Sequence, residues 1–289
     1  MPQPLAAVAA CLIFLGAYVL IATERWATRT AAALGGAALV LALGISDAHG
    51  AFFSEESGVD WNVVFLLLGM MVIVGVMRDT GIFEYLAIWA AKRARGRPFP
   101  LMVLLIVITA AASALLDNVT TVLLVAPVTI LLCQRLALPV VPYLLAEVFA
   151  SNIGGTATLI GDPPNIIIAS RGGLSFNDFL VHLAPVVLVL VVVLVGLCRW
   201  LFAGAFRSDP GRVAQVLALD EREVLTDRRL LVQSLVVLGL VLVAFVFSRG
   251  LGYEPSVVAL LGAGLLIAVT RVTTETALQD VEWDTLAFF

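Results

Sequence analysis

Charged residues are scarce in this chain of 289 residues: they make up 13% of it, whereas 61% of its residues are hydrophobic. With a mean hydropathy of +1.06, the chain belongs with polytopic membrane proteins rather than with globular ones. The longest polar segment, Phe206 to Arg229, is too short to build a hydrophobic core of its own. We therefore expect no soluble domain, and no nucleic acid among the partners.

Cysteine is also rare, and its spacing excludes two kinds of site. Cys11, Cys133 and Cys198 are scattered through apolar runs without any CxxC pair. Neither a disulfide framework nor a zinc site is supported, so these residues are interpreted as small apolar fillers. No Lys or Arg precedes the first apolar run, which we therefore interpret as a first membrane span rather than a signal peptide.

Long apolar runs are abundant, and they predict an all-α fold: a polytopic bundle of transmembrane helices in a lipid bilayer. Six runs are uninterrupted: Leu5 to Ala22, Ala31 to Ile45, Trp61 to Met77, Val181 to Phe202, Leu230 to Phe247, and Pro255 to Thr270. Two further regions, 101–132 and 143–170, are apolar but carry polar residues near their centres.

The polar interruption in region 143–170 predicts an unwound span. Its central sequence, SNIGGTATLIGDPPNIIIAS, occupies 151–170. Each glycine weakens a helix by about 1 kcal/mol, and a Pro-Pro pair removes two backbone donors. A simple proline kink is the alternative, but it needs one Pro or Gly, whereas this stretch contains three Gly, two Pro, two Asn and an Asp. Unwound backbone at membrane depth is tolerated only inside protein or along a polar cavity, and transporters use such breaks as binding sites.

The interruption in region 101–132 falls at Asp117 and Asn118 and leaves arms of about 16 residues on either side. Such arms are short for full crossings of a bilayer about 30 Å thick. We therefore predict a re-entrant hairpin over 101–136 with its tip at the sequence LDNVTT.

Side chains of the two breaks supply the predicted binding site. Amide and hydroxyl oxygens suit a sodium ion, whereas freed backbone amides and Asn side chains suit an anionic or polar solute. The candidate substrate- and ion-binding residues are Asp117, Asn118, Thr120, Thr121, Asn152, Gly154, Gly155, Thr156, Thr158, Gly161, Asp162, Pro163, Pro164 and Asn165. The candidate sodium ligands among them are Asp117, Asn118 and Asp162.

The two acids of the breaks point to cation chemistry. A carboxylate at membrane depth binds a cation, pairs with a base or takes up a proton, and neither break contains Lys or Arg. Cation binding or protonation is therefore the favoured role of Asp117 and Asp162, with a structural cap as the alternative. Glu147, about one turn before the second break, is either a further functional acid or an interfacial residue.

The distribution of Lys and Arg predicts the orientation. If region 101–132 enters and leaves on one side, all 17 basic residues except Arg171 and Arg249 lie on a single face. The positive-inside rule assigns that face to the cytoplasm. We therefore expect a multi-pass protein of the plasma or inner membrane with an external N-terminus.

The end of the chain echoes an earlier segment. VEWDTLAFF at 281–289 resembles VDWNVVFLL at 59–67, and the predicted topology makes them enter the membrane from opposite sides. Opposite entry is typical of the inverted repeats of secondary transporters, although a nine-residue echo can arise by chance. We expect the chain to stop as a second repeat begins. The expected organisation is 1–58 N-terminal spans, 59–203 first repeat, 204–229 cytoplasmic connector, 230–280 linking spans and 281–289 start of the second repeat.

Two motifs carry a family resemblance: LDNVTTVLLVAPVTI at 116–130, followed by AEVFASNIGGTATLIGDPPNIIIAS at 146–170. Together they resemble the ion transporter superfamily, in particular the arsenite-pump and sodium/proton-antiporter type permeases (ArsB/NhaD) and their pink-eyed dilution subgroup. The divalent-anion/sodium symporters are more distantly similar. The resemblance covers residues 59–203 and implies half of a substrate and sodium site in a homodimeric elevator-type carrier.

Individual positions match the symporter pattern in part. The matching residues are Asn118 of the hairpin motif and Gly154, Gly155, Pro163, Pro164 and Asn165 of the broken span. The sequence departs from that pattern where Asp117 replaces a Ser, Val119 replaces a Thr, and Asp162 stands in place of a small hydroxyl residue. These departures argue against dicarboxylate transport and favour cation or proton chemistry.

The leading hypothesis is thus a secondary active permease that moves a small inorganic or organic anion by alternating access, coupled to sodium or protons. A sodium/proton antiporter and an ion channel are the alternatives within membrane transport. An intramembrane enzyme using Asp117 and Asp162 as an acid-base pair has little support, because no catalytic hydroxyl or histidine motif accompanies them. We expect no catalytic residues and no cofactor beyond the coupling ion.

Overall fold

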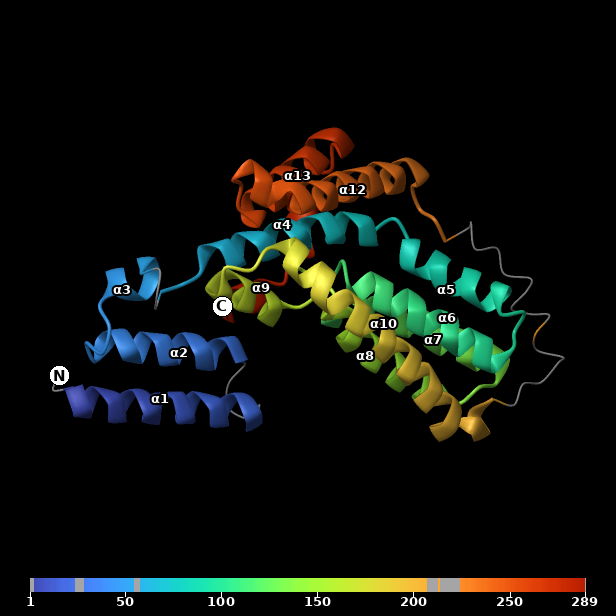
Figure 1. Ribbon diagram of the computed structural model, residues 1–289, viewed down its shortest axis with the longest axis horizontal. Helices are drawn as coiled ribbons and strands as arrows, with labels where there is room; N and C mark the ends of the chain where they lie inside the picture. Colours follow the sequence, from blue (N-terminus) through green and yellow to red (C-terminus); the bar gives the residue numbers. More distant parts are fainter. Residues whose placement is uncertain (1–2, 24–28, 55–57, 207–212, 214–223, 289) are drawn as a thin grey trace. The chain divides into compact units, whose positions relative to one another are not determined.

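The computed structural model describes residues 3–23, 29–54, 58–206, 213 and 224–288, and all elements within them are helices (Figure 1). Within these described ranges, five helices are long and apolar enough to cross a membrane, which confirms the predicted class of a polytopic helical membrane protein. Each of the six uninterrupted apolar runs lies largely in one helix. The chain divides into two compact units, Met1–Val64 with Val281–Phe289, and Phe65–Asp280.

The first unit is built on a pair of helices that lie side by side, α1 and α2 (Figure 1). The Thr30 hydroxyl of α2 donates to the carboxylate of Asp284 in α15, with 3.3 Å between the oxygens. Both segments of the predicted sequence echo begin a helix at their tryptophan, α4 at Trp61 and α15 at Trp283. The elements are α1 (Gln3–Thr23), α2 (Arg29–Ala42), α3 (Ala48–Phe53), the start of α4 (Trp61–Arg78) and α15 (Trp283–Phe288).

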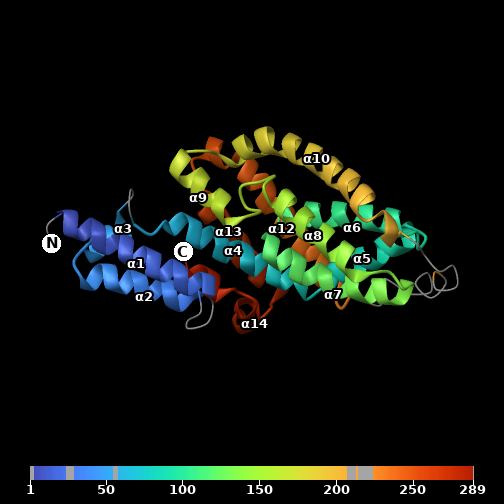
Figure 2. The same cartoon turned by 90° about the horizontal axis from the view of Figure 1, so that it is seen from below.

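The second unit contains the bundle that carries both predicted breaks. Helix α8 packs against α6, α7 and α10, and α5 packs against α6 and α7 (Figure 2). A continuous apolar core fills this bundle, and the buried Cys133 and Cys198 belong to it, as expected of apolar fillers. The elements are α5 (Ile82–Arg93), α6 (Pro98–Ser113), α7 (Asn118–Leu136), α8 (Val140–Gly155), α9 (Pro163–Gly172), α10 (Phe176–Leu201) and the 3₁₀ turn η1 (Ala203–Ala205).

Helices α12 and α13 form a second packed pair within this unit (Figure 1). Gly262 makes their close approach possible, because a Cβ atom there would lie 2.2 Å from a methyl carbon of Val241. The last elements of the unit are α12 (Arg228–Leu251), α13 (Pro255–Thr270) and α14 (Thr274–Gln279).

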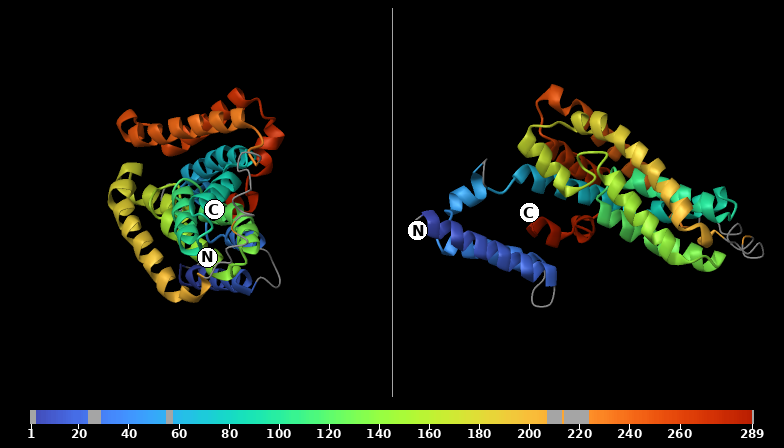
Figure 3. Two further views of the ribbon diagram at one scale, coloured as in Figure 1. Left: turned by 90° about the vertical axis from the view of Figure 1, so that its right-hand side faces the viewer. Right: turned by 60° about the horizontal axis from the view of Figure 1, so that its bottom comes forward.

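One helix of the bundle presents an apolar outer surface. Helix α10 lies along the bundle in both views of Figure 3, and Val181, Leu188, Val192 and Trp200 along it are largely exposed. Such a surface would be unfavourable in water, whereas in a bilayer it contacts lipid tails. The exposed side of α10 therefore fits the lipid environment that the composition predicts.

The connector predicted at 204–229 lies mostly outside the described residues, but described residues of it dock on the bundle. Val213 and Val224 pack against the core around α5 and α6. The backbone N–H of Thr226 donates to the carbonyl of Thr80, with 3.2 Å between nitrogen and oxygen. Gly81 makes this docking possible, because its φ is +76° and a Cβ atom there would lie 2.1 Å from the Val224 carbonyl oxygen.

We predict that Gly81→Ala detaches this part of the connector, and Gly252→Ala is the matched control. Both glycines have positive φ, so each substitution incurs about 1–2 kcal/mol of backbone strain. Only Gly81 faces a carbonyl; nothing lies within 4 Å of a Cβ atom at Gly252. Gly81→Ala should therefore lower the free energy of unfolding, measured by thermal denaturation in detergent, by about 1–3 kcal/mol more than Gly252→Ala does. A protease should also cleave Gly81→Ala faster near residue 224. Equal losses in the two variants would contradict the docking.

Candidate functional site

The predicted unwinding of region 143–170 is confirmed. Helix α8 ends at Gly155, helix α9 begins at Pro163, and residues 156–162 between them form no helix. The Pro163-Pro164 pair occupies the first turn of α9, where the missing backbone N–H groups need no helical partner. These prolines therefore start the second half-helix rather than only breaking the first.

The glycines of the break act mainly through close packing. Gly154 and Gly155 are still helical, and neither they nor Gly161 have positive φ. A Cβ atom at Gly154 would lie 2.2 Å from the carbonyl oxygen of Ala110 in α6, and one at Gly161 would lie 2.6 Å from that of Ser113. Only glycine lets the broken span touch the backbone of α6, which sequence-based helix propensity does not reveal.

The other break, that of the hairpin, joins α6 to α7 through a four-residue turn at 114–117. Asp117 is the N-cap of α7: its Oδ1 accepts a hydrogen bond from the backbone N–H of Thr120 at 2.8 Å. The arms are 16 and 19 residues long, so the second arm is longer than expected and is itself long enough to span. Re-entry of this hairpin therefore stays a prediction.

The two breaks meet, and a chain of hydrogen bonds joins them. The Ser113 hydroxyl donates to the Ser151 carbonyl at 2.7 Å, and the Ser151 hydroxyl donates to the Asn118 carbonyl at 2.8 Å. The side-chain amide of Asn118 donates to the side-chain oxygen of Asn152 at 3.2 Å. The hairpin tip and the broken span thus form one polar junction, although they are some 35 residues apart in sequence.

Three of the predicted ligand residues use their side chains to satisfy the backbone of the breaks. The Thr158 hydroxyl donates to the Ala114 carbonyl at 2.5 Å, and the Thr121 hydroxyl donates to the Asp117 carbonyl at 2.8 Å. The Asn165 amide donates to the carbonyls of Gly155 and Thr158, each at 3.0 Å. These side chains hold the junction together, and their role as ligands stays a prediction.

Other candidates stay accessible at the junction. Asn152 and Thr156 are exposed, and Asp117, Asn118 and Asp162 are half-buried. Asp162 is the N-cap residue of α9 but makes no capping hydrogen bond through its side chain, so the structural-cap alternative is not observed there. The Asp117 and Asp162 carboxylates are close enough to interact electrostatically. Two neighbouring carboxylates with amide oxygens beside them suit a hard monovalent cation.

The sequence left open whether Glu147 is a functional acid or an interfacial residue. The structure contradicts the interfacial alternative. Its side chain is only 1% exposed, and its Oε1 accepts a hydrogen bond from the Thr129 hydroxyl at 2.5 Å. The available signal was its spacing of four residues from Ser151, which places both on one face of α8. Helix periodicity did not show whether Glu147 faces protein, because the residues before and after it in the sequence are apolar.

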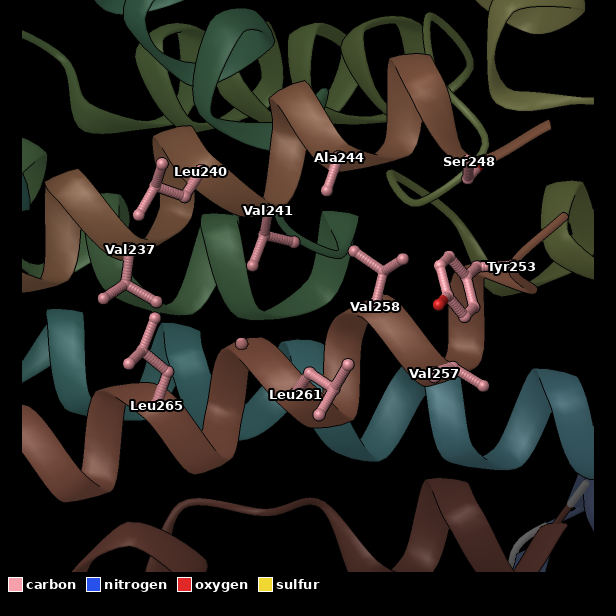
Figure 4. A pocket seen from close by; sticks show the side chains of 11 residues that line it. Val237, Leu240, Val241, Ala244, Ser248, Tyr253, Val257, Val258, Leu261 and Leu265 are labelled. Carbon is pink, nitrogen blue, oxygen red and sulfur yellow. The ribbon is translucent and has the colours of Figure 1, made fainter. Parts of the chain in front are cut away.

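A separate cavity of about 260 Å³ lies between α12 and α13 (Figure 4). Two of its lining side chains, those of Ser248 and Tyr253, carry a hydroxyl group. The Ser248 hydroxyl already donates to the Phe245 carbonyl. The remaining lining residues include Val237, Leu240, Val241, Val258 and Leu261. The cavity suits a hydrocarbon group rather than an ion, and it is distinct from the predicted site.

Apolar helices that surround a polar junction between a helical hairpin and a broken span are typical of membrane transport proteins. Comparison with known families agrees, because the citrate transporter family profile matches residues 18–289. The chain therefore belongs to the citrate transporter family. This family, and the transporter names of its relatives, indicate a transporter rather than an enzyme.

Relatives of the chain include proteins from bacteria and mammals. An uncharacterized transporter of Mycobacterium bovis is 56% identical over 282 residues, covering 98% of this chain and 65% of the relative. The 46 kDa membrane protein of Mycobacterium leprae is 55% identical, covering 98% and 66% respectively. The P protein of Homo sapiens is 32% identical over 352 residues, covering 97% and 42%. The resemblance to the pink-eyed dilution group is thus confirmed, and the chain spans about two thirds of the bacterial relatives.

We predict that Gly154→Ala opens the junction, and Gly196→Ala in α10 is the matched control. The added methyl group at Gly154 must displace the α6 backbone, which overpacks the contact and lowers the free energy of unfolding by about 1–3 kcal/mol. Nothing lies within 4 Å of a Cβ atom at Gly196, so alanine there should be neutral or stabilise by up to about 1 kcal/mol. Thermal denaturation in detergent measures both, and equal stability of the two variants would contradict the close contact.

Proposed function

We propose that the protein is a secondary active carrier that moves a small anion by alternating access, coupled to sodium or protons. The single observation behind this proposal is the hydrogen-bonded junction of Asn118, Ser151 and Asn152, where two interrupted helices meet. Half-helix ends and freed backbone groups at such junctions hold solutes in other secondary transporters. Citrate, named in the description of the family, is the first anion to test.

A cation is needed for an anion to bind here. Asp117 and Asp162 would repel a carboxylate substrate, and neither break contains Lys or Arg to offset that repulsion. We propose that a sodium ion held by Asp117, Asn118 and Asp162 neutralises the two acids. Asn152 and Thr156 would then be the side chains that contact the anion.

Sodium/proton exchange is a second candidate, and the same pair of acids favours it. Two carboxylates that compete for one cation or for protons could exchange the two without an anionic substrate. Sodium-driven proton movement in the absence of any anion would support this candidate over the carrier of anions. Single-channel current steps would contradict both.

Location and assembly belong to the same proposal. The bias of Lys and Arg supports a multi-pass protein of the cell membrane with its N-terminus outside. The family resemblance supports a homodimer.

We predict that Asp162→Asn abolishes the stimulation of transport by sodium. Loss of one charged ligand should weaken sodium binding about tenfold or more, which corresponds to at least ~1.4 kcal/mol. The measurement is uptake of radiolabelled citrate into liposomes that contain the full-length protein, at a series of sodium concentrations. An unchanged sodium dependence would contradict the role of Asp162.

Asp79→Asn is the control for this substitution. Asp79 is exposed at the end of α4, and partial burial together with the nearby Asp280 raises the pKa of its carboxyl. Its charged neighbours are Asp280 and Arg78, neither of which belongs to the junction, so the sodium dependence of uptake should remain that of the wild type.

We predict that residues 49 and 93 lie on opposite sides of the membrane. His49 and Arg93 are both exposed, so a cysteine at either position can react with a thiol reagent. In a Cys11→Ser background, His49→Cys should react with an impermeant maleimide in intact cells, and Arg93→Cys only after permeabilisation. The reverse pattern would invert the proposed orientation.

A further inference from the structure

Glu147 lies in an apolar interface with an incomplete set of partners. It is on the face of α8 that also carries Tyr143 and Ser151, and all three side chains are buried. Thr129 of α7 donates to Oε1, whereas Oε2 is buried and has no hydrogen-bond partner among the described residues. A carboxylate anion with one hydroxyl donor in such surroundings would be strongly destabilised.

No positive charge among the described neighbours compensates Glu147. Helix α6 has no titratable side chain. Helix α7 contributes the buried Cys133, and its Arg135 is exposed. Helix α10 contributes the buried Cys198, whereas its Arg199 is exposed and lies over the rings of Phe99 and Phe206. The remaining titratable groups of these helices are Tyr143, whose hydroxyl donates to the Pro98 carbonyl, and Asp178 and His182 at the opposite end of α10.

We propose that Glu147 is a proton-binding site, separate from the two breaks, and that its protonation is coupled to the transport cycle. A proton on the carboxyl group removes the buried charge and lets α7 and α8 pack as they do here. Loss of the proton leaves an anion that must reach water or a cation, so α7 and α8 must rearrange around it. Proton occupancy thus favours the packed arrangement over the rearranged one.

Helix α8 connects this acid to the junction. Ser151 lies one turn beyond Glu147 and is fixed on both sides, to Ser113 of α6 and to Asn118 of α7. A shift of α8 relative to α7 at Glu147 therefore changes the hydrogen bonds that join the hairpin tip to the broken span. The coupling to transport rests on the proposed function, whereas proton binding at Glu147 does not.

Infrared spectroscopy of the full-length protein in liposomes tests proton binding without a substrate. The wild type should show the carbonyl stretch of a protonated carboxylic acid that disappears as the pH is raised. Glu147→Gln should lack this band. Glu254→Gln, which changes an exposed acid at the start of α13, should keep it. A band that persists in Glu147→Gln, or its absence from the folded wild type, would overturn the proposal.

Thr129 provides an independent variant in case Glu147→Gln does not fold. Thr129→Val removes the hydrogen bond to the carboxyl oxygen and should raise the frequency of the acid band, whereas Thr129→Ser should leave it near the wild-type position. Absence of any shift in folded Thr129→Val would contradict the assignment of the band to Glu147.

Citrate uptake driven by an inward proton gradient tests the coupling. The ratio of uptake with and without the gradient should fall to about one in Glu147→Gln and stay at the wild-type value in Glu254→Gln. A wild-type ratio retained by Glu147→Gln would overturn the coupling. Absence of any citrate flux in the wild type would instead contradict the proposed anion carrier while leaving the infrared result intact.

Discussion

A helix that stops inside a membrane protein leaves backbone carbonyls and amides without helical partners, and this constraint shapes the bundle around α8. Hydrocarbon offers no hydrogen bonds, so the partners must come from nearby protein. Here Ser113 of the hairpin donates to the Ser151 carbonyl, and Asn165 of the broken span donates to the Gly155 carbonyl. The dependence is mutual, because Thr158 in turn donates to the Ala114 carbonyl of the hairpin turn and Ser151 donates to the Asn118 carbonyl at the start of α7. Each break thus supplies hydrogen-bond donors to the other.

This mutual dependence requires very short distances between backbones. Short side chains such as Ser and Thr can donate hydrogen bonds only to backbone that lies close by, so α6 and the broken span must approach closely. Gly154 and Gly161 meet that requirement, since a Cβ atom at either position would overlap a carbonyl of α6. Small residues at helix contacts are the usual way in which membrane helices gain packing energy where no hydrophobic driving force acts between them. The polar junction and the glycine contacts are therefore two parts of one arrangement.

Sequence reasoning located the helices and both interruptions because Gly, Pro, Asn and Asp break the apolar runs at definite positions. It did not give the tasks of the residues within those interruptions. Gly154 was expected to weaken α8, yet it is helical and serves a contact with Ala110 that only the tertiary structure reveals. The burial of Glu147 was open for a similar reason: an apolar helix in a membrane has no polar face, so the sequence does not show which side faces protein. The cavity between α12 and α13 was not predictable for the same reason, because the sequence does not show which sides of these two helices face each other.

The neutral and the charged side chains of the two breaks have different roles. Neutral hydroxyls and amides, such as those of Thr121, Thr158 and Asn165, are used up in holding the backbone of the breaks. The carboxylates of Asp117 and Asp162 remain half-buried at the same place, where an ion from water can neutralise them. Glu147 is another acid of this bundle and lies buried beside Thr129, where no such access is observed, so a proton is the smallest species that can neutralise it. Because a proton requires no coordination shell, a dry interface can bind it and still pack, whereas a sodium ion would need several oxygen ligands. Under the proposed function, acids of the same chemistry would thereby bind different cations because their surroundings differ.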